Sequence, residues 1–157
     1  MISIYTDGSC DKAGKGSWAF VGVHSAASEI VFQNFGVVNN ATNNRMELTA
    51  AIKAIQYMSA SKMQFPIKIF SDSAYVIGGF TKGWEKTWRK NNWIGSQGRE
   101  IKNRDLWEII LNLEKQYSSR IEWLHIRGHN GDKWNEYCDR LSRNCRNKEL
   151  QFEGGRL

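Results

Sequence analysis

Residues 2–9 read ISIYTDGS, an alternation of apolar and polar residues that is typical of a β-strand. The run ends in a carboxylate, Asp7, and a turn is expected directly after it. Residues 67–73 read IKIFSDS and repeat this construction, with Asp72 where the strand gives way. If the two strands are parallel neighbours, both carboxylates emerge at one edge of the sheet, where α/β proteins place their ligands. At ~4 Å and an effective dielectric of about 20 the two charges repel by roughly 4 kcal/mol, so we expect a cation between them.

The segments around these two strands predict the first half of the architecture. Two β-type runs, at residues 17–23 and 29–38, follow the first strand so closely that the three should form an antiparallel meander. A helix at residues 43–59 then leads through Pro66 into the strand at residues 67–71. This crossover should be right-handed and should place the fourth strand parallel to the first.

The second half of the chain predicts helices and one further strand. A short helix should run from Ser73 to the glycine pair at 78–79, and an apolar pattern predicts a helix at residues 106–113. A strand at residues 120–126 precedes a last helix, whose apolar stripe consists of Trp134, Cys138, Leu141 and Cys145. The expected fold is α/β: a mixed five-stranded sheet, in which an antiparallel meander of three strands adjoins two parallel strands, with helices on both faces.

The composition indicates one globular domain with an anionic partner. The 157 residues are 41% hydrophobic and 24% charged, which is ordinary for a soluble domain. We expect a single domain at residues 1–147 and a flexible polar tail at residues 148–157. The 22 Lys and Arg against 16 Asp and Glu give a net charge of +6, which favours a polyanion as the partner.

The cysteines and the hydropathy bear on the setting of the protein. Cys10, Cys138 and Cys145 are an odd number without the spacing of a metal site, which indicates a reducing, intracellular environment. No apolar run approaches the roughly 20 residues that span a bilayer, and no signal-peptide pattern precedes the first strand. We therefore expect a cytoplasmic protein that does not enter a membrane.

Residues 82–104 form a basic segment that holds nearly all of the net charge, with seven Lys or Arg side chains but only two Glu. Trp84 and Trp88 lie four residues apart and Trp93 follows, so that aromatic rings alternate with cations as they do in nucleic-acid grooves. Alternatively, the tryptophans anchor the segment to the core. Both interpretations hold together if the indoles are partly structural while Lys and Arg contact phosphate.

Two further acids lie beside apolar helical stripes. Glu47 precedes Leu48, so its carboxylate should tilt towards the sheet. It also completes a capping-box pattern with Asn44, in which case its role is to cap the helix. Asp139 lies next to Cys138 on the last helix, where an acid is more often a solvated or ion-paired residue than part of a site.

His129 lies in a loop between Gly128 and Gly131 and has no apolar face to fill. A histidine in such a loop is available for proton transfer or for contact with phosphate. His125, inside an apolar strand, is interpreted as structural.

Four motifs, in this order, closely resemble type 1 ribonuclease H: YTDGS at residues 5–9, TNNRMEL at 42–48, SDSAYV at 71–76 and GH-x5-NE-x2-D at 128–139. The resemblance covers residues 2 to about 146, and the four motifs together are far more specific than any one of them. The basic segment, residues 82–104, resembles the basic handle of the bacterial-type enzymes and is called the handle below.

The resemblance implies hydrolysis of the RNA strand of an RNA–DNA hybrid, with two Mg²⁺ ions and 5′-phosphate and 3′-hydroxyl products; Mn²⁺ is the alternative ion. By this resemblance Asp7 would bridge both ions, Asp139 would hold the ion that activates water, and Glu47 with Asp72 would hold the leaving-group side. His129 would relay a proton or assist product departure. Two ions about 4 Å apart stabilise both the attacking and the leaving oxygen, which requires several converging carboxylates.

The resemblance also implies contacts with the substrate. Asn43 and Asn44 match positions that contact the hybrid in its minor groove, where 2′-hydroxyls are displayed. Thr42 and Asn103 match a pocket that grips a phosphate of the DNA strand, and Trp84 matches an aromatic residue beside a deoxyribose. The other handle residues expected to bind the substrate are Lys86, Trp88, Arg89 and Lys90.

The sequence therefore predicts a monomeric, cytoplasmic, Mg²⁺-dependent endoribonuclease that acts on RNA–DNA hybrids. One alternative is a nuclease of the same fold that acts on DNA; the Asn43–Asn44 pair and the handle argue against it. The other alternative is a module that binds the hybrid without cleaving it. Mere binding gives no reason to gather four acids on a polyanion, so the acid set argues against this alternative.

Overall fold

The computed structural model describes residues 1–117, 120–128 and 131–147. Five strands form one mixed sheet in the order β3-β2-β1-β4-β5. β1 runs antiparallel to β2 and parallel to β4, while β2 pairs with β3 antiparallel and β4 with β5 parallel. This arrangement confirms the predicted α/β fold. The bounds of the strands are Ile2–Cys10 (β1), Gly16–His24 (β2), Glu29–Val38 (β3), Ile67–Ser71 (β4) and Ile121–His125 (β5).

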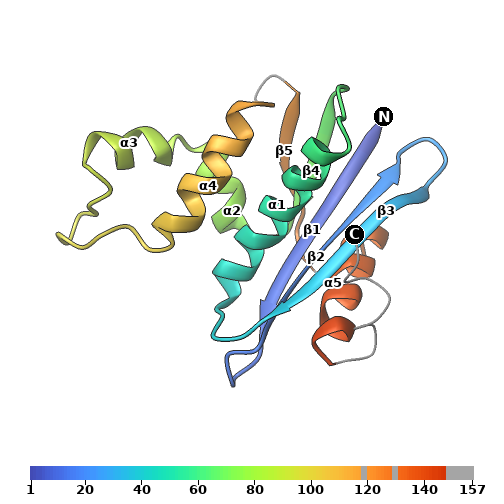
Figure 1. The fold of residues 1–157 in the computed structure, drawn as a ribbon, viewed down its shortest axis with the longest axis horizontal. Helices are drawn as coiled ribbons and strands as arrows, with labels where there is room; N and C mark the ends of the chain where they lie inside the picture. Colours follow the sequence, from blue (N-terminus) through green and yellow to red (C-terminus); the bar gives the residue numbers. More distant parts are fainter. Residues whose placement is uncertain (118–119, 129–130, 148–157) are drawn as a thin grey trace.

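Helices cover both faces of the sheet, as predicted (Figure 1). α1 and α4 pack on one face over a core that includes Ile4, Phe20 and Trp107, whereas α5 packs on the other over Ala19 and Val21. None of the described helices has the length and apolar character needed to cross a membrane. The helices are α1 (Asn43–Ala60), α2 (Ala74–Thr81), α3 (Trp84–Lys90), α4 (Arg104–Lys115) and α5 (Lys133–Arg146).

The first strand continues beyond the point where the sequence predicted its end. The parallel pairing with β4 stops at Thr6 and Ser71. The antiparallel pairing with β2 carries β1 on to Cys10, which lies opposite Gly16. The expectation of a turn directly after Asp7 was therefore wrong, because β2 continues to satisfy the backbone there. Asp7 is the first residue of β1 beyond the parallel ladder.

The N-terminus of α1 also differs from one of the predicted alternatives. The N-cap is Thr42, whose side-chain oxygen accepts a hydrogen bond from the backbone N–H of Arg45 at 3.2 Å. Asn44 lies inside the first turn, so the capping box with Glu47 is not formed. The predicted apolar stripe is buried throughout, at Leu48, Ala51, Ile52, Ile55 and Met58.

α2 passes through the glycine pair at which the sequence predicted its end, and it ends at Thr81. Both glycines are buried under indole rings. A Cβ atom on Gly78 would come within 2.7 Å of the Trp84 ring, and one on Gly79 would collide with the ring of Trp107. The two glycines therefore allow the tryptophans of α3 and α4 to pack closely against α2, and they do not end this helix.

Gly79→Ala is expected to destabilise the fold by about 1–3 kcal/mol, although alanine is the better helix former. The added methyl group would have to displace the fully buried indole of Trp107. Chemical denaturation of the purified variant measures the effect. Gly95→Ala is the matched control, because its Cβ would meet no atom closer than 3.4 Å. Equal stability of the Gly79 variant and wild type would contradict the packing described here.

Candidate active site

Three carboxylates from three elements meet beside the end of the parallel ladder. Asp7 comes from β1, Glu47 from the first turns of α1 and Asp72 from the residue after β4. Each offers one oxygen, and these oxygens all lie within 4.8 Å of one another. The register that pairs Thr6 with Ser71 brings the first and third of these acids together, as the sequence predicted.

Glu47 is held in the site by the backbone of β1. The Gly8 N–H donates a hydrogen bond to its Oε1 at 2.8 Å. This approach requires a glycine, because a Cβ on Gly8 would collide with the backbone of Met46 in α1. Of the two predicted alternatives for Glu47, the site carboxylate is the one that the structure contains.

Asp139 approaches the same cluster from α5. Its carboxylate is close enough to that of Asp7 to contribute to the raised pKa of Asp7. It is also ion-paired, with 2.9 Å between its Oδ2 and Nη2 of Arg143. Asp139 is therefore ion-paired, as one of the predicted alternatives has it, and it also flanks the three-carboxylate group.

The electrostatics of the cluster show the repulsion among its members. Burial, followed by the charges of Asp72 and Asp139, raises the pKa of Asp7 to about 8. Burial and the neighbouring Asp7 and Asp72 likewise raise the pKa of Glu47 well above its ordinary value, against the hydrogen bond from Gly8. Burial and then the same four acids raise the pKa of the Cys138 thiol, which favours its protonated form in the metal-free protein.

The predicted catalytic histidine, His129, lies outside the described residues. Its neighbour Gly128 lies against Asp72, where a Cβ would come within 3.2 Å of the carboxylate oxygen Oδ2. His125 is exposed, and its Nε2 lies 3.2 Å from the carbonyl oxygen of Asp72. His125 ends β5 as predicted, and its contact with a backbone carbonyl oxygen agrees with a structural role, but it is exposed because β5 is an edge strand.

The residues predicted to contact the hybrid lie around the start of α1. Thr42, Asn43 and Asn44 are exposed. The side-chain oxygen of Asn43 accepts a hydrogen bond from the backbone N–H of Cys10 at 2.8 Å, which fixes the amide beside the end of β1. A row of polar groups thus continues from the carboxylates to the N-terminus of α1.

Asn103 is tied to α1 by a residue that the sequence did not single out. Arg45 forms a two-fold ion pair with Asp105, at 2.9 and 2.7 Å, and also donates to the side-chain oxygen of Asn103 at 3.3 Å. The amide nitrogen of Asn103 donates to the hydroxyl of Tyr75 at 3.1 Å. Arg45 is part of the motif at residues 42–48, but the sequence pattern did not indicate that it binds Asn103 and Asp105.

The handle projects away from the sheet as α3 and the loop that follows it (Figure 1). Its indoles are packed together: the ring centroids of Trp88 lie 5.9 Å from Trp84, 5.6 Å from Trp93 and 5.2 Å from Trp107. The predicted anchoring role of the tryptophans is confirmed. Lys86 and Lys90 are exposed, whereas Arg89 is ion-paired with Glu85 at 2.7 Å.

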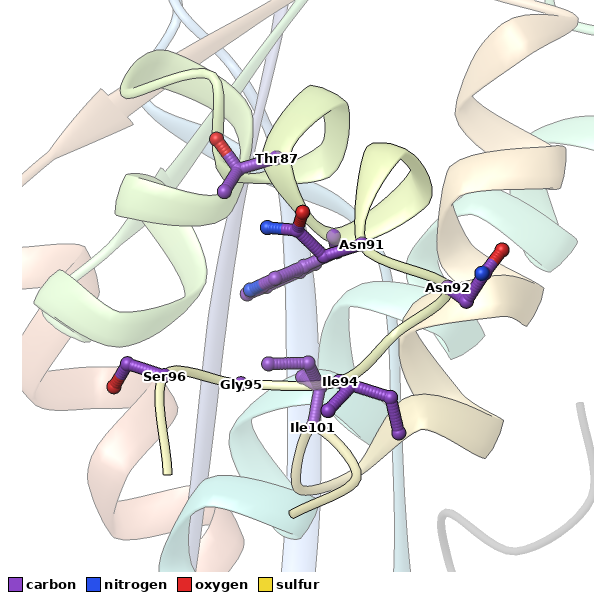
Figure 2. A pocket seen from close by; sticks show the side chains of 8 residues that line it. Thr87, Asn91, Asn92, Ile94, Gly95, Ser96 and Ile101 are labelled. Carbon is purple, nitrogen blue, oxygen red and sulfur yellow. The ribbon is translucent and has the colours of Figure 1, made fainter. Parts of the chain in front are cut away.

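A pocket of about 630 Å³ opens between α3 and the loop of the handle. Figure 2 shows Asn91 on its α3 side and Ile94 and Ile101 on its loop side. All of its lining comes from the handle itself, so the carboxylates have no part in this pocket.

Comparisons with known proteins agree with this geometry. The RNase H family model matches residues 1–147. The ribonuclease H of Caldanaerobacter subterraneus subsp. tengcongensis is 38% identical over 143 residues, covering 90% of this chain and 88% of the relative. That of Syntrophomonas wolfei subsp. wolfei is 40% identical over 145 residues, covering 92% and 94%.

Solved structures show the same fold. LC9-RNase H1, described as a type 1 RNase H with the type 2 active-site motif, superposes with a TM-score of 0.80 at 26% identity, covering 98% of this chain and 75% of that chain. LC11-RNase H1, solved in complex with RNA/DNA hybrid, gives a TM-score of 0.72 at 16% identity, covering 96% and 99%. The second likeness concerns the fold alone.

Proposed function

Because the chain belongs to the ribonuclease H family of enzymes, we propose that it hydrolyses the RNA strand of RNA–DNA hybrids with two divalent metal ions, leaving 5′-phosphate and 3′-hydroxyl ends. The observation that carries this proposal is the convergence of Asp7, Glu47 and Asp72 within 4.8 Å, with Asp139 beside them. All of these groups come from one chain, so a monomer suffices. The cytoplasmic setting stays a prediction.

The carboxylates fit a hard divalent cation. Oxygen donors are the ligands that Mg²⁺ prefers, and the raised pKa of Asp7 shows that its charge lacks compensation within the protein. Asp7, Glu47, Asp72 and Asp139 would hold the ions. When bound, such ions lower the pKa of water and stabilise the charge that develops on the phosphate oxygens. Mg²⁺ is the ion proposed, with Mn²⁺ as the substitute.

The chain's own residues place the substrate and the proton. The Gly8 N–H fixes one oxygen of Glu47 and leaves the other for the site. Asn43, held by the backbone of Cys10, presents its amide to the minor groove of the hybrid. His129 follows Gly128, which lies against Asp72, and we propose that it relays a proton or assists product departure.

A substrate panel tests the proposed function. End-labelled RNA–DNA hybrid, duplex RNA and duplex DNA are incubated with the enzyme, with EDTA, Mg²⁺ or Mn²⁺. We expect cleavage of the RNA strand of the hybrid only, dependent on metal, with 3′ ends that a polymerase extends directly. Preferential cleavage of DNA would support the nuclease of the same fold instead. Tight binding without any cleavage would support the binding module.

The handle should contribute to affinity through Lys86 and Lys90, which form no ion pair with the residues that the structure describes. Replacing both Lys86 and Lys90 by Ala should weaken hybrid binding and lower the slope of log affinity against log salt by about 0.9 per lost contact. Arg89→Ala should change this slope less, because the guanidinium is already paired with Glu85. Binding titrations at several salt concentrations measure both effects. A loss of the single-turnover rate at saturation with unchanged affinity would refute this role of the handle.

A further inference from the structure

One edge of α5 carries two arginines in line with Asp139. Arg143 and Arg146 follow it by four and seven residues, which places all three on the same side of the helix. Arg143 is paired with Asp139 and its side chain is 52% exposed. Arg146 is half-buried. The edge therefore leads from the carboxylate cluster to a pair of cations about 6 to 10 Å further along the helix axis, at ~1.5 Å of rise per residue.

This edge of α5 runs beside β1. Asp7 and Ser9 point to the same face of the sheet, because side chains alternate along a strand. Asp7 meets Asp139 there, and Nη1 of Arg146 donates a hydrogen bond to the hydroxyl of Ser9. The contact with Ser9 fixes the guanidinium two residues along β1 from the catalytic carboxylate.

The same end of β1 borders the proposed substrate site on its other side. Asn43 binds the backbone of Cys10, the residue after Ser9. Cys10 pairs with Gly16 of β2, and Lys15 is the residue before Gly16. Burial raises the pKa of the Cys145 thiol to about 11, and the charge of the nearby Lys15 opposes this rise. The cations of α5 are therefore continuous with the surface that is proposed to hold the hybrid.

We propose that Arg146, together with Arg143, binds phosphates of the RNA strand adjacent to the cleaved one. The proposal rests on the proposed function. If the cleaved phosphate lies at Asp7 and Asp139, the phosphates nearest to the α5 edge belong to the same strand. The ~6 to 10 Å along the edge spans the first two or three linkages beside the cleaved one, at ~3.4 Å of rise each along the duplex.

The chemistry of the two arginines suits this role. A guanidinium has five N–H donors in a fixed fork that matches phosphate oxygens. Arg146 uses Nη1 on Ser9, which leaves the other nitrogens for the ligand while the side chain stays oriented. Among the described residues, Arg146 is the arginine that is hydrogen-bonded to β1 beside the carboxylate cluster. It lies on the side of β1 that faces away from α1.

Binding of the hybrid in EDTA tests the proposal without turnover. Arg146→Gln should weaken binding about tenfold and lower the salt slope by up to about 0.9, while the single-turnover rate at saturating enzyme with Mg²⁺ changes less than about twofold. Arg140→Gln is the matched control, because it removes the same charge from the same helix on a side turned ~100° from Asp139. Equal effects of the two variants would overturn the proposal.

The strand is identified with single uncharged methylphosphonate linkages. In wild type, one such linkage in the RNA strand beside the cut should weaken binding, and in Arg146→Gln that same linkage should have little further effect. The assignment would be overturned if the effect of the linkage depended on Arg146 only for linkages in the DNA strand, or for no linkage in either strand. Ser9→Ala removes the hydrogen bond that orients the guanidinium of Arg146 but keeps its charge. It should therefore weaken hybrid binding less than Arg146→Gln does. This second variant keeps the proposal testable if Arg146→Gln folds poorly. A wild type that fails to cleave the hybrid would refute the proposed function itself, which is a separate outcome.

Discussion

Asp7→Asn is expected to slow hybrid cleavage by at least about a thousandfold. Asp7 is the most buried residue of the cluster, with 5% of its surface exposed, and both Asp72 and Asp139 lie close enough to raise its pKa. A neutral amide there would lose about 4 kcal/mol of transition-state stabilisation, because it holds a divalent ion far less well than a carboxylate does. Single-turnover cleavage of an end-labelled hybrid with Mg²⁺ measures the effect.

The control for this experiment is Asp11→Asn, which makes the same chemical change in the first loop. Its Oδ1 accepts hydrogen bonds from the backbone N–H groups of Ala13 and Lys15, and an amide oxygen can accept these as well. We expect its cleavage rate within about twofold of wild type. If Asp7→Asn kept most of the activity, the metal site would have to be placed elsewhere.

The metal-free protein is expected to become less stable as the pH rises from about 4 to about 8, and Asp7→Asn should remove much of this loss. The pKa of Asp7 is raised from 3.8 to about 8 in the folded state. In this window the folded state binds more protons than the unfolded state, so the free energy of unfolding falls with increasing pH. Four pKa units correspond to at most about 5 kcal/mol.

Urea denaturation of both proteins in EDTA, at pH 5 and pH 8.5, measures this difference. Groups whose pKa does not depend on Asp7 cancel when the variant is compared with wild type at each pH, whereas the relief of Glu47, whose pKa Asp7 raises, adds to the difference in the same direction. At pH 8.5 the variant should be the more stable protein. Mg²⁺ should reduce the difference in the free energy of unfolding between the variant and wild type, because bound ions stabilise the wild type by mass action. A variant that is less stable than wild type at pH 8.5 in EDTA would show that Asp7 has favourable partners within the protein.

The sequence predicted the parallel pair of strands and the meeting of Asp7 with Asp72, because both depend on local alternation and on the handedness of a crossover. The local pattern left Glu47 undecided between helix cap and site, and only the resemblance assigned it to the site. The decision depends on Gly8, whose backbone approaches α1 only in the folded molecule.

Other misses also arose from contacts distant in sequence. The glycines at 78–79 carry the signature of a helix end, yet Trp84 packs against the first and Trp107 against the second, and α2 continues. Arg146 and Ser9 are 137 residues apart, and no periodicity links a strand end to the last turn of a helix. Short-range patterns thus predicted the elements and two of the acids, whereas tertiary packing determined the caps and the partners.

The contact between the central strand and the last helix has a consequence for synthesis on the ribosome. The Cys138 sulfur lies 3.5 Å from the carbonyl oxygen of Tyr5, across 133 residues of chain. β1 is translated first, but the side of β1 that faces α5 remains exposed to solvent until α5 has left the exit tunnel. Asp139 arrives with that same helix. If Asp139 belongs to the metal site, as proposed, the site is incomplete in the nascent chain until α5 closes the core, so that the proposed catalysis depends on a late step of folding.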